Sequence, residues 1–226
     1  MIPMSDETDQ RWTVVEVLRK GGSSRPRVEQ VRLGDRQAVL KDHAGCDPLF
    51  ALMLGPTLTR RECKALRKLA SVKGVPGLIE RCGSRALLME WMPAIPFKYV
   101  QRDRKFWEGF FAELEHRLDT MHQHGVAHCD LRSLNNVLLD ETGQPCIVDF
   151  VACFFAGPSW NPLWRGLFRR FCRVDMDALN KLKYQVAPEL LSEKEMMEIG
   201  HSGWLDRGAR QLGILFRRLS RLLFTR

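Results

Sequence analysis

The sequence has no run of about 18 apolar residues, the length that a helix needs to cross a bilayer. Its first stretch, MIPMSDETDQRW, is polar and acidic and lacks the apolar segment of a signal peptide. We therefore predict a cytoplasmic protein that does not span a membrane. Residues 1–10 are predicted to be a disordered tail.

Pairs of the form C-x-x-C are also missing, and the seven cysteines are an odd number. Both features argue against a disulfide framework or a zinc site and favour a reducing compartment. The sequence has no internal repeat and no low-complexity segment, so nothing in it suggests a repeat architecture.

What the sequence does have is enough apolar material for a globular core, with 45% hydrophobic and 27% charged residues among 226. The formal net charge is +8, which favours an anionic partner such as a nucleotide, a nucleic acid or an acidic membrane surface. Charge alone does not choose among them. Because no RNA-reading motif is found, nucleic acid is not expected as a partner.

The first half of the chain alternates short apolar runs with turn residues, which predicts an antiparallel meander, a helix and two more strands. The strands are expected over residues 12–18, 28–33, 37–42, 78–82 and 86–91. The helix is expected over 57–70, with Thr57 or Thr59 as its N-cap and with Leu66 and Leu69 on its apolar face.

The second half is predicted to be mainly helical. Residues 104–124 carry apolar side chains at spacings of three and four, the pattern of a buried helix. Residues 92–96 (MPAIP) are predicted to be a linker between two lobes. Two short strands, VLLD and CIVDF, are expected around the turn ETGQP, and the chain after residue 160 is expected to be helical or irregular.

Residues that suit phosphoryl transfer gather in the segment HCDLRSLNNVLLD and in the D-F pair that follows it. Transfer from ATP needs one carboxylate to orient the acceptor hydroxyl and take its proton, and further oxygen ligands to hold Mg²⁺. Asp130 suits the first task. Asp149, which ends an apolar strand, and either Asn135 or Asn136 suit the second. Arg132 is placed to stabilise charge on the transferring group.

Two ways of aligning the loop choose different asparagines as the metal ligand. Counting five residues from Asp130 selects Asn135, whereas the strand pattern N-V-L-L-D selects Asn136, which we favour. His128 is expected to hold the loop through hydrogen bonds rather than to act as a base. Cys129 is expected to be unreactive, because a neighbouring carboxylate raises the pKa of a thiol.

These segments resemble the motifs of protein kinases. The loop that begins at His128 is similar to the kinase catalytic loop, and Asp149-Phe150 is similar to the first two residues of the D-F-G motif. The segment A-V-L-K looks like V-A-I-K. By this resemblance Lys41 is the phosphate-binding lysine, and Glu62 on the following helix is its partner.

The same resemblance implies ATP and Mg²⁺ as cofactors. Glu90 and Met92 belong to a segment that looks like the hinge whose backbone holds adenine. Gly21, Gly22 and Ser23 resemble a glycine-rich loop, in a shortened form. A second departure from the kinase pattern is the valine that follows Asp149-Phe150 in place of glycine.

In detail the chain is similar to compact atypical kinases, namely the bacterial lipopolysaccharide-core (Kdo or heptose) kinase and RIO-like group. The fold class that this implies is α+β, as a two-lobed protein-kinase-like fold in a single domain. A small N-terminal antiparallel β-sheet lobe is expected over residues 11–92, a hinge over 93–96, and a truncated, mainly α-helical C-lobe over 97–226.

The acceptor implied by this group is a hydroxyl, with a sugar of a lipopolysaccharide or another lipid-linked glycan as the first candidate. A protein serine or threonine and a small-molecule alcohol are alternatives. A pseudokinase that only binds nucleotide is the alternative from a different class. Residues 160–173 and 209–226 are basic and amphipathic, which predicts peripheral contact with an anionic membrane unless their apolar faces pack on the lobe.

Overall fold

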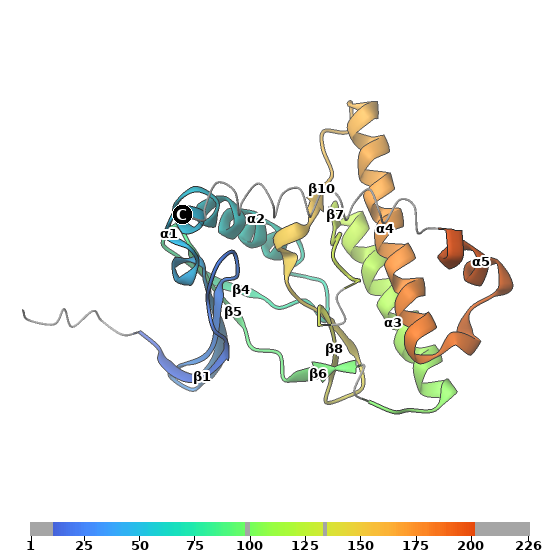
Figure 1. The fold of residues 1–226 in the computed structure, drawn as a ribbon, viewed down its shortest axis with the longest axis horizontal. Helices are drawn as coiled ribbons and strands as arrows, with labels where there is room; N and C mark the ends of the chain where they lie inside the picture. The colour runs from blue at the N-terminus through green and yellow to red at the C-terminus, as the bar shows by residue number, and fades with distance from the viewer. Residues whose placement is uncertain (1–10, 98–99, 133–134, 202–226) are drawn as a thin grey trace, which may run out of the picture. The chain divides into compact units, whose positions relative to one another are not determined.

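A computed structural model describes residues 11–97, 100–132 and 135–201. The predicted tail over residues 1–10 and the amphipathic segment 209–226 lie outside the described residues. The protein is α+β, with an N-terminal sheet followed by helices and small sheets (Figure 1). The chain divides into two compact units. Of the described residues, 11–59 and 78–91 form the N-terminal unit, and 60–77 and those from 92 to 201 form the C-terminal unit.

The N-terminal unit is built on a five-stranded antiparallel sheet in the order β1-β2-β3-β5-β4, which confirms the predicted strands. Val31, Ala38, Leu40 and Leu88 pack as its buried apolar cluster. The strands are β1 (Thr13–Arg19), β2 (Arg27–Leu33), β3 (Arg36–Asp42), β4 (Leu78–Cys82) and β5 (Ala86–Glu90).

Two helices, α1 (Pro48–Met53) and α2 (Gly55–Lys68), follow β3. The Asp47 carboxylate accepts a hydrogen bond from the Leu49 backbone N–H, and Pro48 occupies the first turn of α1, which together fix where this helix begins. The predicted cap of α2 was wrong, since α2 begins at Gly55 and Thr59 is buried within it.

The C-terminal unit contains two small sheets. One has the order β6-β8-β9, from β6 (Ala94–Pro96), β8 (Val137–Asp140) and β9 (Pro145–Ile147), and the other pairs β7 (Val126–Ala127) with β10 (Phe154–Phe155). The segment MPAIP was expected to be only a linker. Its last three residues instead pair antiparallel with β8, where the backbone groups of Ile95 face Leu139.

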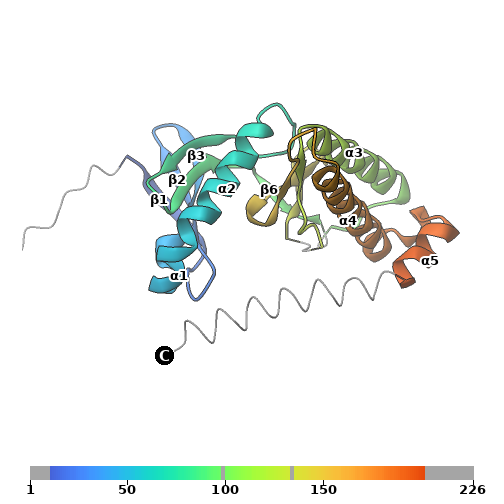
Figure 2. The ribbon, with the colours of Figure 1, turned by 90° about the horizontal axis from the view of Figure 1, so that it is seen from above.

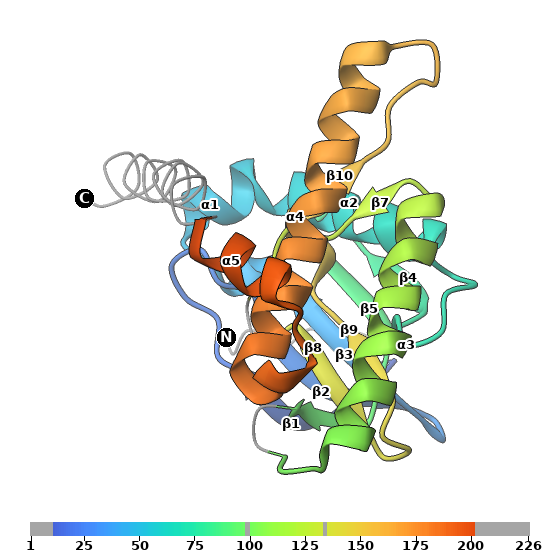
Figure 3. The same ribbon diagram turned by 90° about the vertical axis from the view of Figure 1, so that its right-hand side faces the viewer.

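Two long helices dominate the C-terminal unit, α3 (Arg104–Gln123) and α4 (Pro162–Val186), and α5 (Glu193–His201) follows them. Figures 2 and 3 show α3 and α4 side by side, running in opposite directions. The predicted apolar stripe of α3 is buried, and Phe110 and Phe111 pack edge-to-face with ring centroids 5.4 Å apart. None of the helices among the described residues has the length and apolarity to cross a membrane.

Candidate functional site

The candidate site is built on the β8–β9 hairpin and the loop that precedes it. Val137 and Ile147 face each other in the hairpin, and the Val148 N–H donates to the Asn136 carbonyl at 3.0 Å. This pairing aligns the loop that carries Asp130 with the end of the strand that carries Asp149. The two candidate catalytic acids therefore lie beside adjacent strands of one small sheet, Asp130 in the loop before β8 and Asp149 two residues after β9.

Asn136 ties the loop together. Its buried side-chain Nδ2 donates to the Asp130 backbone carbonyl at 2.9 Å and to the Asp130 carboxylate at 3.2 Å. Asn135, the alternative ligand, is exposed. Because Asn136 binds Asp130 through its side chain and Val148 through its backbone, it is the asparagine that connects the two acids.

Desolvation raises the pKa of Asp130, and the nearby charge of Asp149 raises it further. The hydrogen bond from Asn136 and the charge of Arg132 act in the opposite direction. A carboxylate with a raised pKa is a stronger base once ionised, and Asp130 is the exposed end of this network.

His128 is fully buried, and its ring links the backbone groups of Asp130 and Val148. Its Nε2 lies 3.0 Å from the Val148 carbonyl, and its Nδ1 accepts from the Asp130 N–H at 3.3 Å. These partners require a neutral ring with the proton on Nε2. Burial lowers the pKa of His128, which favours that neutral form. The structural role predicted for His128 is confirmed.

Asp149 has a left-handed backbone, with φ 69° and ψ 72°. Non-glycine residues seldom adopt this conformation, and they do so most often at functional sites. The next three residues, Phe150–Ala152, form a 3₁₀ turn, with Phe150 buried edge-on against the His128 ring at 4.9 Å between centroids. Among the described non-glycine residues, positive φ is found at Ser23, Cys129 and Asp149, so Val151 adopts a conformation that does not require glycine.

Asp175 on α4 fixes the other side of the loop. One carboxylate oxygen accepts from the His128 N–H and the other from the Cys129 N–H, each at 2.7 Å. Asp175 is completely buried, and Cys129 is one of the residues with positive φ. The carboxylate therefore holds two consecutive backbone N–H groups immediately before Asp130. Burial raises the pKa of the Cys129 thiol, in agreement with its predicted inertness.

His122, in the last turn of α3, completes this cluster. Its Nε2 lies 3.0 Å from the Asp175 carboxylate. Burial alone lowers the pKa of His122, but the hydrogen bonds with Asp175 and Cys172 outweigh burial and raise it to about 9. At neutral pH His122 is therefore a cation that offsets the buried charge of Asp175.

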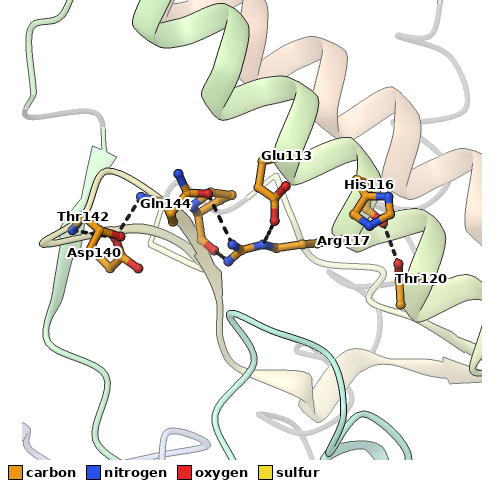
Figure 4. Close-up of polar contacts among 8 residues, drawn as sticks. Glu113, His116, Arg117, Thr120, Asp140, Thr142 and Gln144 are labelled. Atoms are coloured by element: carbon orange, nitrogen blue, oxygen red, sulfur yellow. Dashed lines mark hydrogen bonds and ion pairs between the residues drawn. The ribbon is translucent and has the colours of Figure 1, made fainter.

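Arg117 braces the hairpin from the side of α3 (Figure 4). The buried guanidinium donates to Glu113 on the same helix, to the Pro145 carbonyl and to the Gln144 side chain. At the turn itself, the Asp140 carboxylate accepts from the Thr142 and Gln144 N–H groups, both within 2.9 Å. These contacts hold the turn and the start of β9.

The N-terminal unit carries the predicted nucleotide-binding residues. Lys41 is buried on the central strand β3, between Val28 on β2 and Leu87 on β5 in the register of the sheet. Glu90 is exposed at the end of β5. A lysine in the interior of a small domain is uncommon and calls for a functional or pairing role.

The predicted glycine-rich loop is a tight turn. Gly22 and Arg25 exchange backbone hydrogen bonds, at 3.1 Å and 2.9 Å, so the turn has only Ser23 and Ser24 at its tip. The Ser23 carbonyl accepts from the Asp47 N–H at 2.8 Å. A Cβ on Gly21 would lie 2.7 Å from the Gly45 carbonyl oxygen, so Gly21 is needed for close backbone packing.

The remaining predicted site residues belong to the C-terminal unit. Glu62 is completely buried on α2, whereas Met92 and Arg132 are half-buried. Within the described ranges, no three His, Cys, Asp or Glu side chains gather as a metal-binding cluster. A cation at this site would therefore need asparagine or substrate oxygens besides Asp149.

No protein-family model matches the chain. A segment of 58 residues is 47% identical to protein kinase C epsilon type from Rattus norvegicus. The match covers 24% of this chain and 8% of that protein. Over this segment the chain is similar to a protein kinase, in partial agreement with the resemblance noted from its motifs.

Three residues that matter to the site were not singled out from the sequence. Asp175 lies 47 residues after His128 in an arginine-rich helix, and Arg117 lies 28 residues before its acceptor Pro145. Neither belongs to a short motif. His122 belongs to no short motif either, and its link to Asp175 spans 53 residues.

Proposed function

We propose that the chain is an ATP- and Mg²⁺-dependent phosphotransferase with a two-lobed protein-kinase-like fold. The observation that supports this most is the hydrogen-bonded network of Asp130, Asn136 and Val148, the residue before Asp149. Buried Asp175 and neutral His128 hold that network in place. The short identity to a protein kinase points the same way.

Asp130 is the proposed base. It accepts the proton of the acceptor hydroxyl as the acceptor oxygen bonds to the γ-phosphorus, and the bond from the γ-phosphorus to the bridging oxygen breaks to release ADP. Its raised pKa suits proton acceptance. Arg132, whose charge reaches Asp130, is proposed to stabilise the negative charge on the transferring group.

Asp149 and Asn136 are the proposed metal ligands. Carboxylate and amide oxygens are the hard donors that Mg²⁺ prefers. The Asn136 Nδ2 is already used by Asp130, which leaves the side-chain oxygen of Asn136 available as a ligand. Bound Mg²⁺ would neutralise phosphate charge. Asn135, which is exposed, is the second choice.

The nucleotide would be held mainly by the N-terminal unit. Lys41 is proposed to contact the inner phosphates and Glu62 to position Lys41, in line with their burial. The backbone at Glu90 and Met92 is proposed to hold adenine. The turn that contains Gly21, Gly22 and Ser23 is proposed to cover the phosphates.

The acceptor is proposed to be a sugar hydroxyl of a lipopolysaccharide or another lipid-linked glycan. This choice rests on the resemblance of the loop D-L-R-S-x-x-N-V-L to the lipopolysaccharide-core kinases. A protein serine and a small-molecule alcohol are the alternatives. A phosphate-transfer screen across lipopolysaccharide fragments, generic protein substrates and amino-sugars separates the three.

The test of the enzymatic proposal is turnover of ATP with Mg²⁺ by the purified full chain. We expect Asp149→Ala to abolish turnover and Asp130→Ala to lower it by about 10²–10⁴-fold, the range that general base catalysis contributes. Equal background turnover in the wild type and both variants would contradict the proposal.

A pseudokinase is the second candidate, and the phosphate-covering turn favours it. The Gly22 N–H, which a phosphate-binding loop would direct at ATP, is bonded to the Arg25 carbonyl. This candidate predicts that ATP binds with no transfer to any acceptor and no hydrolysis. Binding measured by calorimetry alongside turnover distinguishes the two functions.

A further inference from the structure

The first turns of α4 extend beyond the rest of the C-terminal unit. Figures 1 and 3 both show them reaching past the C-terminal end of α3. Large apolar side chains on this projection are exposed: Trp160 by 80%, Leu163 by 85%, Trp164 by 41% and Leu167 by 40%. A contiguous exposed apolar surface of this kind usually marks an interaction site.

This projection is ordered by its own contacts. The Asn161 side chain caps α4 by accepting from the Trp164 N–H at 3.1 Å. The Trp164 ring stacks on Phe154 at 5.3 Å, and its indole N–H donates to the Phe155 carbonyl at 3.1 Å. Leu163 and Leu167 are therefore presented to solvent on a fixed helix.

Charge on the projection is of one sign. No aspartate or glutamate occurs between Asp149 and Asp175. At 100° per residue, Arg165, Arg169 and Arg173 share one face of the helix. Leu167 lies on the opposite face with Trp164 and Phe171, and Leu163 lies next to it. All three arginines are exposed.

The arginine face also contains a recess. A hollow of about 500 Å³ is lined by Gly166, Arg169, Cys172 and Arg173. Gly166 has no side chain to fill it, and a Cβ there would meet no neighbour within 4 Å. Two guanidinium groups at one hollow suit an anionic oxygen group such as a phosphodiester.

We propose that residues 160–173 dock on the surface of an anionic lipid bilayer. They comprise Trp160, the N-cap Asn161 and the first half of α4. Trp160, Leu163 and Leu167 enter the boundary between headgroups and acyl chains, and the arginines contact lipid phosphates. A projecting surface that combines tryptophan, leucine and arginine without acids is complementary to such an interface. The proposal uses none of the residues assigned to phosphoryl transfer, so it holds or fails independently of the proposed enzymatic activity.

The test is flotation of the full chain with vesicles of phosphatidylcholine alone and of phosphatidylcholine with phosphatidylglycerol. We expect recovery with the anionic vesicles only, and less recovery as salt rises, because salt screens the charge attraction. Trp160→Ser with Leu163→Ser should lower partitioning about tenfold or more, through lost apolar burial. Arg165→Gln with Arg169→Gln should lower it about fivefold per arginine.

Matched controls come from other exposed positions. Leu52 and Met53 are exposed by 68% and 61% on α1, and their double serine variant should float like the wild type. Arg67→Gln with Lys73→Gln removes the same charge from exposed positions outside α4 and should have the smaller effect.

Three outcomes would overturn the proposal. The first is failure of the wild type to float with anionic vesicles. The second is flotation unchanged in both α4 variants, which would place the lipid contact elsewhere in the chain. The third is a concentration-dependent dimer in sedimentation that the Trp160–Leu163 variant dissociates, because the surface would then bind a second copy.

Discussion

At the scale of single residues, Asp175 connects the most distant parts of the site. Its carboxylate accepts from the backbone N–H groups of His128 and Cys129, just before Asp130, and pairs with His122. All three contacts are buried or nearly buried, so removing one of them lowers the free energy of unfolding. The left-handed backbone of Cys129 depends on one of them.

Replacing Asp175 with asparagine removes one acceptor oxygen and leaves at least one buried N–H without its acceptor. We expect a loss of about 1–3 kcal/mol in the free energy of unfolding for each N–H affected. Urea unfolding measures this loss. Asp119→Asn, at an exposed position on α3, is the control and should change stability by less than about 0.5 kcal/mol. Equal effects of the two variants would contradict the assigned role.

His122 and His128 predict opposite dependences on pH. The folded-state pKa of His122, about 9, exceeds the unfolded value of about 6.5. Its contribution is therefore complete below pH 6.5 and lost as the pH rises through 9. The folded-state pKa of His128 is lowered, so its protonation in the unfolded state reduces stability as the pH falls below about 6.5.

The measurement is the free energy of unfolding of the wild type and of His122→Gln between pH 6.5 and 9. The wild type should lose stability across this window, and the variant should be less stable at pH 6.5 but change less with pH. Parallel curves for the two proteins would show that His122 is not charged in the folded state.

At the scale of elements, the buried guanidinium of Arg117 on α3 bonds to the β8–β9 hairpin. Arg117→Ala leaves the Pro145 carbonyl and Glu113 without this donor. We expect a loss of about 1–3 kcal/mol, the usual cost of leaving a buried acceptor such as the Pro145 carbonyl without its donor. Thermal or urea unfolding measures it.

Arg104 provides a matched control on the same helix. It also pairs with a glutamate four residues away, Glu108 at 2.8 Å, but both side chains are exposed. Arg104→Ala should cost no more than about 0.5 kcal/mol. If both variants lose the same stability, the hairpin is not anchored by Arg117.

The elements differ in how far the sequence predicts them. Strands β4 and β8 agree with the predicted ranges to the residue, because turn residues bound short apolar runs on both sides. Helix α1 was not predicted, although Asp47-Pro48 is a start signal, since six residues are too few for a clear period. The start of α2 was misplaced because the Leu58 N–H bonds back to Leu54, before either predicted cap.

In the candidate site, residues close together in the sequence could be predicted, and residues brought in from distant segments could not. Asp130, Asn136 and Asp149 could be predicted, because their spacing along one loop and hairpin is itself the signal. Asp175 could not, since only the packing of α4 against the loop brings it there. In the sequence, Val151 departs from the D-F-G motif, which has glycine at this position. In the structure Val151 lies in a 3₁₀ turn, and its backbone conformation does not require glycine.

At the scale of the whole molecule, the acids and the exposed apolar side chains of the C-terminal unit are separated. The site residues lie at the small sheets, whereas the arginines and exposed leucines lie on the first half of α4. If both proposals hold, the chain would phosphorylate an acceptor while docked on the membrane that carries it. Anionic vesicles would then raise the rate with a lipid-linked acceptor and not with a soluble one.

The central claim is that Asp149 and Asp130 support Mg²⁺-dependent transfer of the γ-phosphate of ATP. The most direct measurement is the initial rate of γ-phosphate release or transfer across a Mg²⁺ titration, for the wild type and for Asp149→Asn and Asp130→Asn. Asp140→Asn, at the end of the neighbouring strand, is the matched control, since its accepting oxygen bonds only to the hairpin turn. We predict activity that requires Mg²⁺ in the wild type and the control and is lost at every Mg²⁺ concentration in Asp149→Asn. Activity in Asp149→Asn equal to that of Asp140→Asn would contradict the account.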